Sequence, residues 1–246
     1  MRIIGVSDYN EMSTRAAELL VAQVTLKPDS VLGLATGSTP VGAYERMAEA
    51  YRAGRVSFAQ CRSVNLDEYV GLGPGDAASY HEFMWENLFH HIDILPAHTN
   101  LPNGKCLDAA AECARYDQVL ASLGPIDLQI LGLGHNGHIA FNEPGDHFVP
   151  NTHMVELDEQ TIEANQRFFA RREDVPVTAY TMGLGPILHA RRVLLLVSGE
   201  AKAEILHRSL TGPITPMVPA SILQLHQNLI VIADDAARTW MDREAR

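Results

Sequence analysis

The segment from Leu131 to Pro144 reads LGLGHNGHIAFNEP and carries two histidines, two asparagines and a glutamate directly after an apolar run. His138 and Glu143 are five residues apart, so they can approach each other if the loop between them curls. A carboxylate beside an imidazole fixes its tautomer and raises its basicity, which suits proton transfer near neutral pH. A lone loop histidine is more often simply solvated, but this combination at one strand end favours a reactive site.

A metal site is a second interpretation of the same loop, because His135 lies three residues before His138. No cysteine and no third histidine comes within ligand spacing of the pair. The sequence therefore predicts no bound metal.

A dinucleotide site is a third interpretation, because Gly132, Gly134 and Gly137 spell G-x-G-x-x-G and Glu156 lies about 20 residues further on. That fingerprint needs a sustained helix from its third glycine, whereas Pro144 follows within eight residues. The motif also lies past the middle of the chain rather than on its first strand. We reject the dinucleotide interpretation.

An anion site is predicted at TGSTP, residues 36–40, which follows the apolar run SVLGLA and precedes a helical pattern. Gly37 permits a sharp turn, Ser38 and Thr39 are suitable N-caps, and Pro40 suits the first helical position. Backbone N–H groups at such a helix start, together with hydroxyls, bind phosphate well. The alternative is an ordinary capped turn.

Three further charged residues are candidates for the same site. Asp67 follows the apolar run SVNL, where partial burial can raise the pKa of a carboxyl group and make it a general base; a helix cap or a structural ion pair is the alternative. Lys202 follows VLLLV near a helix start, where a cation opposes the helix dipole unless an anion binds there. Arg167 is the second candidate for a phosphate clamp, and a solvated surface charge is the alternative for both cations.

These side chains need a scaffold, and the pattern of the chain indicates an α/β fold. Short, mostly continuous apolar runs are typical of strands covered on both faces, and amphipathic helical patterns lie between them. We expect one domain, residues 1–246, with a doubly wound, Rossmann-like, mostly parallel sheet of about seven strands and helices on both faces. In such a sheet, ligands bind beyond the C-terminal strand ends. The expected strands cover residues 2–6, 30–35, 63–66, 127–133, 177–182, 193–197 and 229–233.

Composition limits the class of partner. The formal net charge is −11, which disfavours nucleic acid and requires a local positive site for any small anion. The three cysteines lack metal-type spacing, and no stretch approaches the roughly 20 apolar residues of a membrane span. The apolar run near the start is too short for a signal peptide. We expect a cytoplasmic protein that binds neither nucleic acid nor membrane.

Several of these motifs together resemble the glucosamine-6-phosphate deaminase family. The resemblance runs along essentially the whole chain, and its most specific motifs are NLDEYVGL and GHIAFNEP. A weaker similarity extends to 6-phosphogluconolactonases and to sugar-phosphate-sensing regulator domains. The remaining matching motifs, in chain order, are LATGSTPVGAY, RFF, SGEAKA and SILQLH.

The resemblance implies an enzyme that converts glucosamine 6-phosphate and water to fructose 6-phosphate and ammonia, without cofactor or metal. It implies that Asp67 moves a proton between C2 and C1, and that His138 opens the sugar ring. Residues 156–177 would form a mobile lid. The implied partners of His138 are Asn136 and Glu143, and the implied phosphate ligands are Gly37, Ser38, Thr39, Arg167 and Lys202.

Two departures from the family pattern matter. Many members carry aspartate where this chain has Asn136, which can orient an imidazole but adds no charge. Regulated hexameric members have basic residues after the FNEP motif, whereas residues 146–158 contain neither lysine nor arginine. We therefore expect a monomer or small homo-oligomer without activation by an N-acetylated sugar phosphate.

Three alternatives stay open from the sequence. A galactosamine-6-phosphate deaminase differs by one hydroxyl of its substrate. A non-catalytic sugar-phosphate sensor needs the phosphate ligands but neither Asp67 nor His138, and the chain has no helix-turn-helix segment. A lactonase would not need an intact NLDEY motif.

Overall fold

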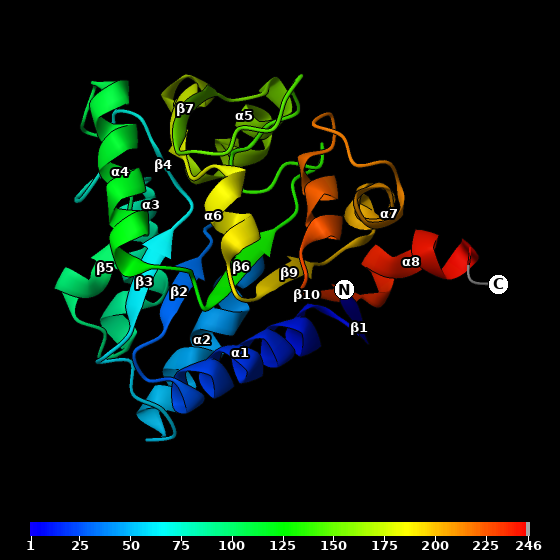
Figure 1. Ribbon diagram of the computed structural model, residues 1–246, viewed down its shortest axis with the longest axis horizontal. Coiled ribbons are helices and arrows are strands. Elements are labelled where there is room, and N and C mark those ends of the chain that lie inside the picture. The colour runs from blue at the N-terminus through cyan, green and yellow to red at the C-terminus, as the bar shows by residue number, and fades with distance from the viewer. Residues whose placement is uncertain (245–246) are drawn as a thin grey trace.

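The centre of the computed structural model, which describes residues 1–244, is a seven-stranded parallel sheet (Figure 1). Its strand order is β1-β10-β9-β6-β2-β3-β5. Neighbouring strands pair in parallel throughout, which confirms the expected sheet. The strands are β1 (Arg2–Val6), β2 (Val31–Leu34), β3 (Arg62–Asn65), β5 (Thr99–Asn100), β6 (Leu128–Gly132), β9 (Val193–Val197) and β10 (Leu229–Asp234).

Helices cover both faces of this sheet. Helices α1 (Tyr9–Leu26) and α2 (Ser38–Arg52) pack against each other below it in Figure 1, and α4, α6 and α7 lie above it. Because both faces are covered, strands such as β9 are buried along their whole length. The remaining helices are α3 (Tyr80–Asn87), α4 (Ala109–Leu123), α5 (Glu159–Asn165), α6 (Leu184–His189), α7 (Ala203–Thr211) and α8 (Asp235–Glu244).

The connections reverse direction between the adjacent strands β2 and β6. The chain leaves β2 through α2 toward β3, whereas it leaves β6 toward β9, on the other side of β6. Right-handed crossovers in opposite directions put their helices on opposite faces, so no helix crosses the strand ends at this point. Such a reversal opens a crevice beyond the carboxyl ends of the two strands.

A second, antiparallel sheet holds three short strands, β4 (Asp67–Tyr69), β8 (Thr178–Thr181) and β7 (His153–Glu156), in the order β4-β8-β7. The assignment of residues 177–182 to the parallel sheet is therefore wrong. The run is apolar because β8 is largely buried, and a strand buried on both faces has the same pattern in either sheet. The seventh parallel strand is instead β5, whose two residues are too short to give a periodic signal.

Helix α5 stops well before the end of the segment TIEANQRFFARR, residues 161–172. α5 ends at Asn165, the 3₁₀ turn Gln166–Phe168 follows, and Phe169 returns to extended backbone. The Phe169 ring meets the edge of the Tyr69 ring at a centroid distance of 5.7 Å. Packing of this aromatic side chain into a small second core thus ends the helix.

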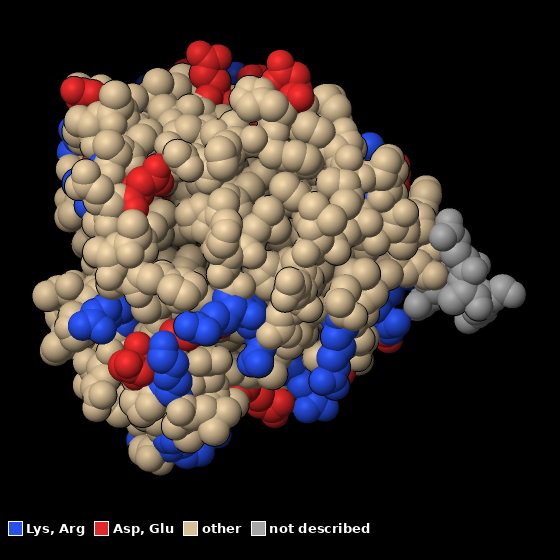
Figure 2. Space-filling model, viewed as in Figure 1, with Lys and Arg blue, Asp and Glu red and all other residues tan. Residues whose placement is uncertain are grey.

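Charged side chains of both signs lie on the face of the protein that Figure 2 draws. Figure 2 shows Lys and Arg side chains mainly in the lower part of this face, interspersed with Asp and Glu, and further Asp and Glu side chains along its upper edge. That face offers no continuous basic surface. Among residues 1–244, no helix combines the length and hydropathy that a membrane crossing requires.

Candidate active site

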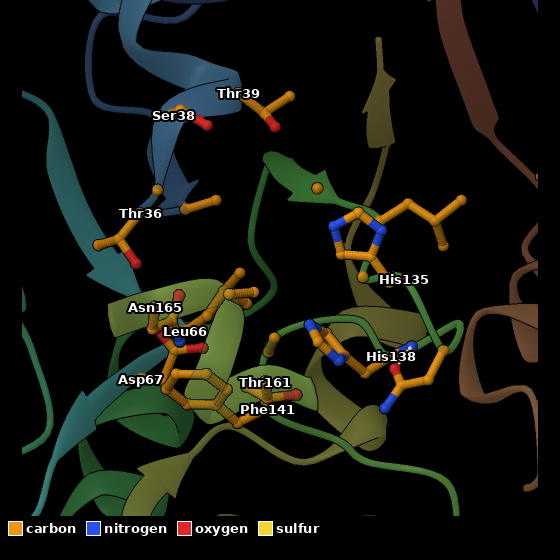
Figure 3. Close-up of a pocket in the computed structure, with 18 of the residues that line it drawn as sticks. Thr36, Ser38, Thr39, Leu66, Asp67, His135, His138, Phe141, Thr161 and Asn165 are labelled. Atoms are coloured by element: carbon orange, nitrogen blue, oxygen red, sulfur yellow. Dashed lines mark hydrogen bonds between the residues drawn. The ribbon is translucent and has the colours of Figure 1, made fainter. Parts of the chain in front are cut away.

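A pocket lies where the loops after β2 and β6 face each other, at the crevice that the reversal creates (Figure 3). Asp67, the first residue of β4, contributes its carboxyl group to the wall of the pocket. Residues of α5 line the pocket as well. The lining thus comes from segments far apart in the sequence. The family resemblance implied nine site residues, and eight of them line this pocket: Gly37, Ser38, Thr39, Asp67, Asn136, His138, Arg167 and Lys202. Glu143, the ninth, lies behind His138.

One end of the pocket combines the start of a helix with a cation. Gly37, with φ 89°, is the N-cap of α2, and no side chain caps the helix. The expected capping by Ser38 or Thr39 is therefore wrong, because both belong to the first helical turn. Without a capping side chain, the first N–H groups of α2 stay available to a ligand. Arg167 Nη2 donates to Ser38 Oγ at 3.2 Å, so a cation stands beside them.

Lys202 adds a second positive charge at this end. Burial, and then the nearby Arg167, lower the pKa of Lys202 to about 8. Lys202 has no carboxylate partner within ion-pair distance in the described part of the chain. His135 also lines the pocket, and its pKa is lowered by burial and by Lys202, His138 and Arg167. A local positive potential thus exists within an acidic protein, as an anion site requires.

The opposite side of the pocket carries an imidazole backed by a carboxylate. His138 Nδ1 lies 3.2 Å from Glu143 Oε2, within ion-pair distance but outside hydrogen-bond alignment. Asn136 bridges the two: its Nδ2 donates to Glu143 Oε2 at 2.7 Å, and its Oδ1 accepts from the His138 backbone N at 3.1 Å. The loop therefore curls as the sequence suggested.

Glu143 is also held from the covering segment. The Thr161 hydroxyl, on α5, donates to Glu143 Oε1 at 2.6 Å. Burial raises the pKa of Glu143, but His138, Thr161 and Asn136 together outweigh burial and leave the pKa below its ordinary value. Glu143 thus stays negatively charged near neutral pH, next to the His138 ring.

The backbone of this loop is shaped around the His138 ring. A Cβ on Gly134 would stand 2.3 Å from the ring's Cδ2 and Nε2 atoms, so only glycine allows this approach. Gly137, with φ 89°, makes the turn before His138, and Ala140 adopts a positive φ of 52°. Such backbone conformations cluster at functional sites. Gly134 and Gly137 of the G-x-G-x-x-G pattern thus shape the backbone around His138.

The adjacent carboxyl groups of Asp67 and Glu68 have different surroundings. Asp67 is 5% exposed, and burial, then the charge of Glu68, raise its pKa to about 8, against a hydrogen bond from Thr36. Glu68 points the other way along β4 and accepts from the backbone N of Tyr80 and of His81, at 2.9 Å each. The capping role considered for this motif therefore belongs to Glu68, and Asp67 stays available to a ligand.

Comparisons with known proteins identify the family of this chain. A family model described as glucosamine-6-phosphate isomerases/6-phosphogluconolactonase matches residues 7–232. The chain belongs to this family. The chain is 53% identical over 232 residues to a glucosamine-6-phosphate deaminase of Lachnoclostridium phytofermentans, an alignment that covers 94% of this chain and 98% of the relative. It is 52% identical over 242 residues to the Clostridioides difficile deaminase, with 98% and 97% covered.

Solved structures give the same family assignment. A monomeric glucosamine-6-phosphate deaminase is 46% identical, superposes with a TM-score of 0.94, and covers 96% of this chain and 98% of its own. The 6-phosphogluconolactonase from Trypanosoma brucei superposes with a TM-score of 0.77 at 20% identity, over 96% and 97% of the two chains. That second likeness shows the shared fold alone.

Several residues that line the pocket were missed from the sequence. Thr36 lies beside Asp67, and Phe141 closes the floor near it (Figure 3). Thr161, Gln160 and Asn165 approach from α5. Thr36 stands next to the TGSTP motif and could have been found there, whereas nothing in the sequence placed Thr161 against Glu143. Among residues 1–244, no three histidine, cysteine or acidic side chains are grouped to hold a metal.

Replacing Gly134 with alanine tests the fit of the loop around His138. The new Cβ would displace the imidazole by about 1 Å, and a shift of that size costs on the order of 100-fold in kcat. The matched control is Gly145→Ala in the same loop, where the nearest atom to a Cβ is the Glu143 carbonyl oxygen at 3.9 Å. Equal kcat values for the two variants would contradict the role of the close approach.

Replacing Asp67 with asparagine tests the burial of its carboxyl group. A pKa raised above the unfolded value means that the folded state holds a proton which the unfolded state has lost, so stability falls as pH rises from about 4 to about 8. The Asp67→Asn variant has no carboxyl group at this position, so its stability does not fall between these pH values for this reason. We expect it to be more stable than the wild type at pH 8 by about 1–3 kcal/mol and nearly equal at pH 4. Urea unfolding at both pH values checks this, and a pH-independent difference would refute it.

Proposed function

We propose that this protein is a glucosamine-6-phosphate deaminase, which converts glucosamine 6-phosphate and water to fructose 6-phosphate and ammonia. One observation carries the proposal: a pair of cations, an imidazole backed by a carboxylate, and a separate buried carboxyl group all face one pocket. The high identity to proteins named as this deaminase supports it.

The phosphate binds first at the cationic end. The N-terminus of α2, with Gly37, Ser38 and Thr39, supplies N–H and hydroxyl donors, and Arg167 and Lys202 supply charge. A dianion there relieves the repulsion between the two cations and keeps Lys202 protonated. This remote contact provides the binding energy that positions the reacting carbons.

His138 opens the sugar ring. Opening moves a proton from the C1 hydroxyl to the ring oxygen, and an imidazole can accept and return a proton near neutral pH. Glu143 stabilises the protonated imidazole through its negative charge, and Asn136 holds the two in place. The products of this step are the open-chain aldehyde and the unchanged side chain.

Asp67 then transfers a proton from C2 to C1. As Asp67 takes the C2 proton, the substrate ammonium gives a proton to the C1 oxygen, which forms an enol-like species. Asp67 then returns its proton to C1, and water hydrolyses the resulting protonated imine at C2 to the ketone and ammonium. The transfer needs the carboxylate form, although burial holds the pKa of Asp67 at about 8. The ammonium on C2 of the substrate brings a positive charge next to Asp67 and lowers that pKa, so the substrate itself generates the base.

Residues 156–177 act as the lid. They include α5, whose Thr161 contacts Glu143, and Arg167, which contacts Ser38 across the pocket. A phosphate bound between Arg167 and α2 would draw this segment down and exclude water from the enol-like species. We assign residues 1–246 to one sugar-phosphate domain that acts in the cytoplasm, where its three free thiols stay reduced.

Ammonia release is the decisive assay. The wild type should release ammonia from glucosamine 6-phosphate faster than from galactosamine 6-phosphate, without added metal or cofactor. Asp67→Asn should lower kcat by at least about 100-fold, since it removes the base but keeps the shape. Faster release from the galacto epimer would favour the alternative substrate, and binding without release would indicate a sensor.

The assembly and its regulation form a separate proposal. A second hollow beside Glu143 is lined by Asp146, His147, His153 and Glu156 and contains no lysine or arginine among its described lining residues. It therefore offers no permanent cation for a second sugar phosphate. We expect hyperbolic kinetics that N-acetylglucosamine 6-phosphate leaves unchanged, from a monomer or small homo-oligomer. Sigmoidal kinetics abolished by that compound would contradict this expectation.

A further inference from the structure

We propose that Asp234 is a positioning residue that aims Lys202 at the substrate phosphate by clamping the turn Ser198–Gly199. The proposal rests on the proposed function only for the identity of the phosphate ester. Asp234 itself does not line the pocket.

The strand register brings the clamp together. Ala233 in β10 pairs with Val197, the last residue of β9, so Asp234, the last residue of β10, lies level with Ser198, the first residue after β9. Asp234 is 5% exposed. Its Oδ2 accepts from Ser198 Oγ at 2.5 Å and from Gly199 N at 3.0 Å, and its Oδ1 also accepts from Ala237 N at 2.8 Å.

The clamped turn determines where Lys202 begins. Gly199 adopts φ 95°, a conformation that side chains disfavour, and its carbonyl accepts from Lys202 N at 3.0 Å. α7 starts directly afterwards at Ala203. A lysine side chain is long and flexible, so a fixed backbone origin reduces the entropy that it loses on reaching a ligand. The carboxylate thus acts on Lys202 through the main chain.

The clamp also decides which donors reach the phosphate. The Ser198 hydroxyl and the Gly199 N–H would otherwise be donors for an anion at this strand end. Asp234 takes both of them, and no cation pairs with Asp234 within the described part of the chain. The uncompensated negative charge keeps a phosphate away from this turn. The phosphate is directed instead toward the Lys202 ammonium and the start of α2.

The test compares Asp234→Ala and Ser198→Ala with Lys202→Ala. The probes are glucosamine 6-phosphate in the ammonia assay and a hexitol 6-phosphate, which has the phosphate but no reducing carbon, in calorimetry. We expect both clamp variants to raise KM and the hexitol phosphate Kd about tenfold, which corresponds to about 1.4 kcal/mol, with kcat within about twofold of the wild type. Lys202→Ala should raise both further, and Asp234→Asn should restore part of the loss.

The matched control is Asp8→Ala. Asp8 is also a capping carboxylate after a strand, accepting from Glu11 N at 2.9 Å, but it does not line the pocket. It should change stability without changing KM or Kd. If Asp234→Ala does not fold, Ser198→Ala decides, because it removes a single hydrogen bond.

Each result is informative. Wild-type Kd values in both clamp variants, or equal losses of kcat in these variants and in Asp8→Ala, would overturn the positioning role. If the wild type binds the hexitol phosphate but releases no ammonia, the proposed function fails, while the calorimetric comparison still tests the clamp.

Discussion

The site depends on the adjacency of β2 and β6, two parallel strands whose connections lead away in opposite directions. Because no helix crosses their carboxyl ends, the loop that holds Gly37 and the loop that holds His138 face each other across an open crevice. β3 and β9 flank the pair, and their ends lead to Asp67 and to the segment carrying Lys202. Each proposed chemical group therefore reaches the crevice from a strand end or from the segment that covers it.

The crevice contains ionisable groups whose charged forms are disfavoured by burial. Lys202 and Arg167 stand near each other at one end, and burial with their repulsion lowers the pKa of Lys202 to about 8. Asp67 is buried beside the charge of Glu68 at the other end. In the proposed mechanism, a phosphate relieves the repulsion between the two cations, and a substrate ammonium relieves the burial of Asp67. The pocket would then favour one orientation of a substrate that carries opposite charges at these two places.

The sequence was informative about strand ends and much less so about packing between distant segments. Continuous apolar runs located six of the seven parallel strands, and the residues that follow them supplied Asp67, His138 and Lys202. The same periodicity could not assign β8 to its sheet, because burial on both faces looks alike in either sheet. It could not reveal that Thr161 reaches Glu143, or that Asp234 holds the Gly199 turn, because these contacts depend on register and crossover.

Asp67 and Glu68 are adjacent in the short strand β4, but their side chains have different surroundings. Successive side chains of a strand point to opposite sides, so Glu68 caps the start of α3 while Asp67 faces the pocket. The structural carboxylate still affects the chemistry, since its charge helps to raise the pKa of Asp67. In the proposed mechanism, a protonated Asp67 is a poor base before the substrate arrives and becomes a good one beside the substrate ammonium. That proposal attributes selectivity for an amino sugar over an ordinary hexose phosphate to electrostatics at C2 as well as to shape.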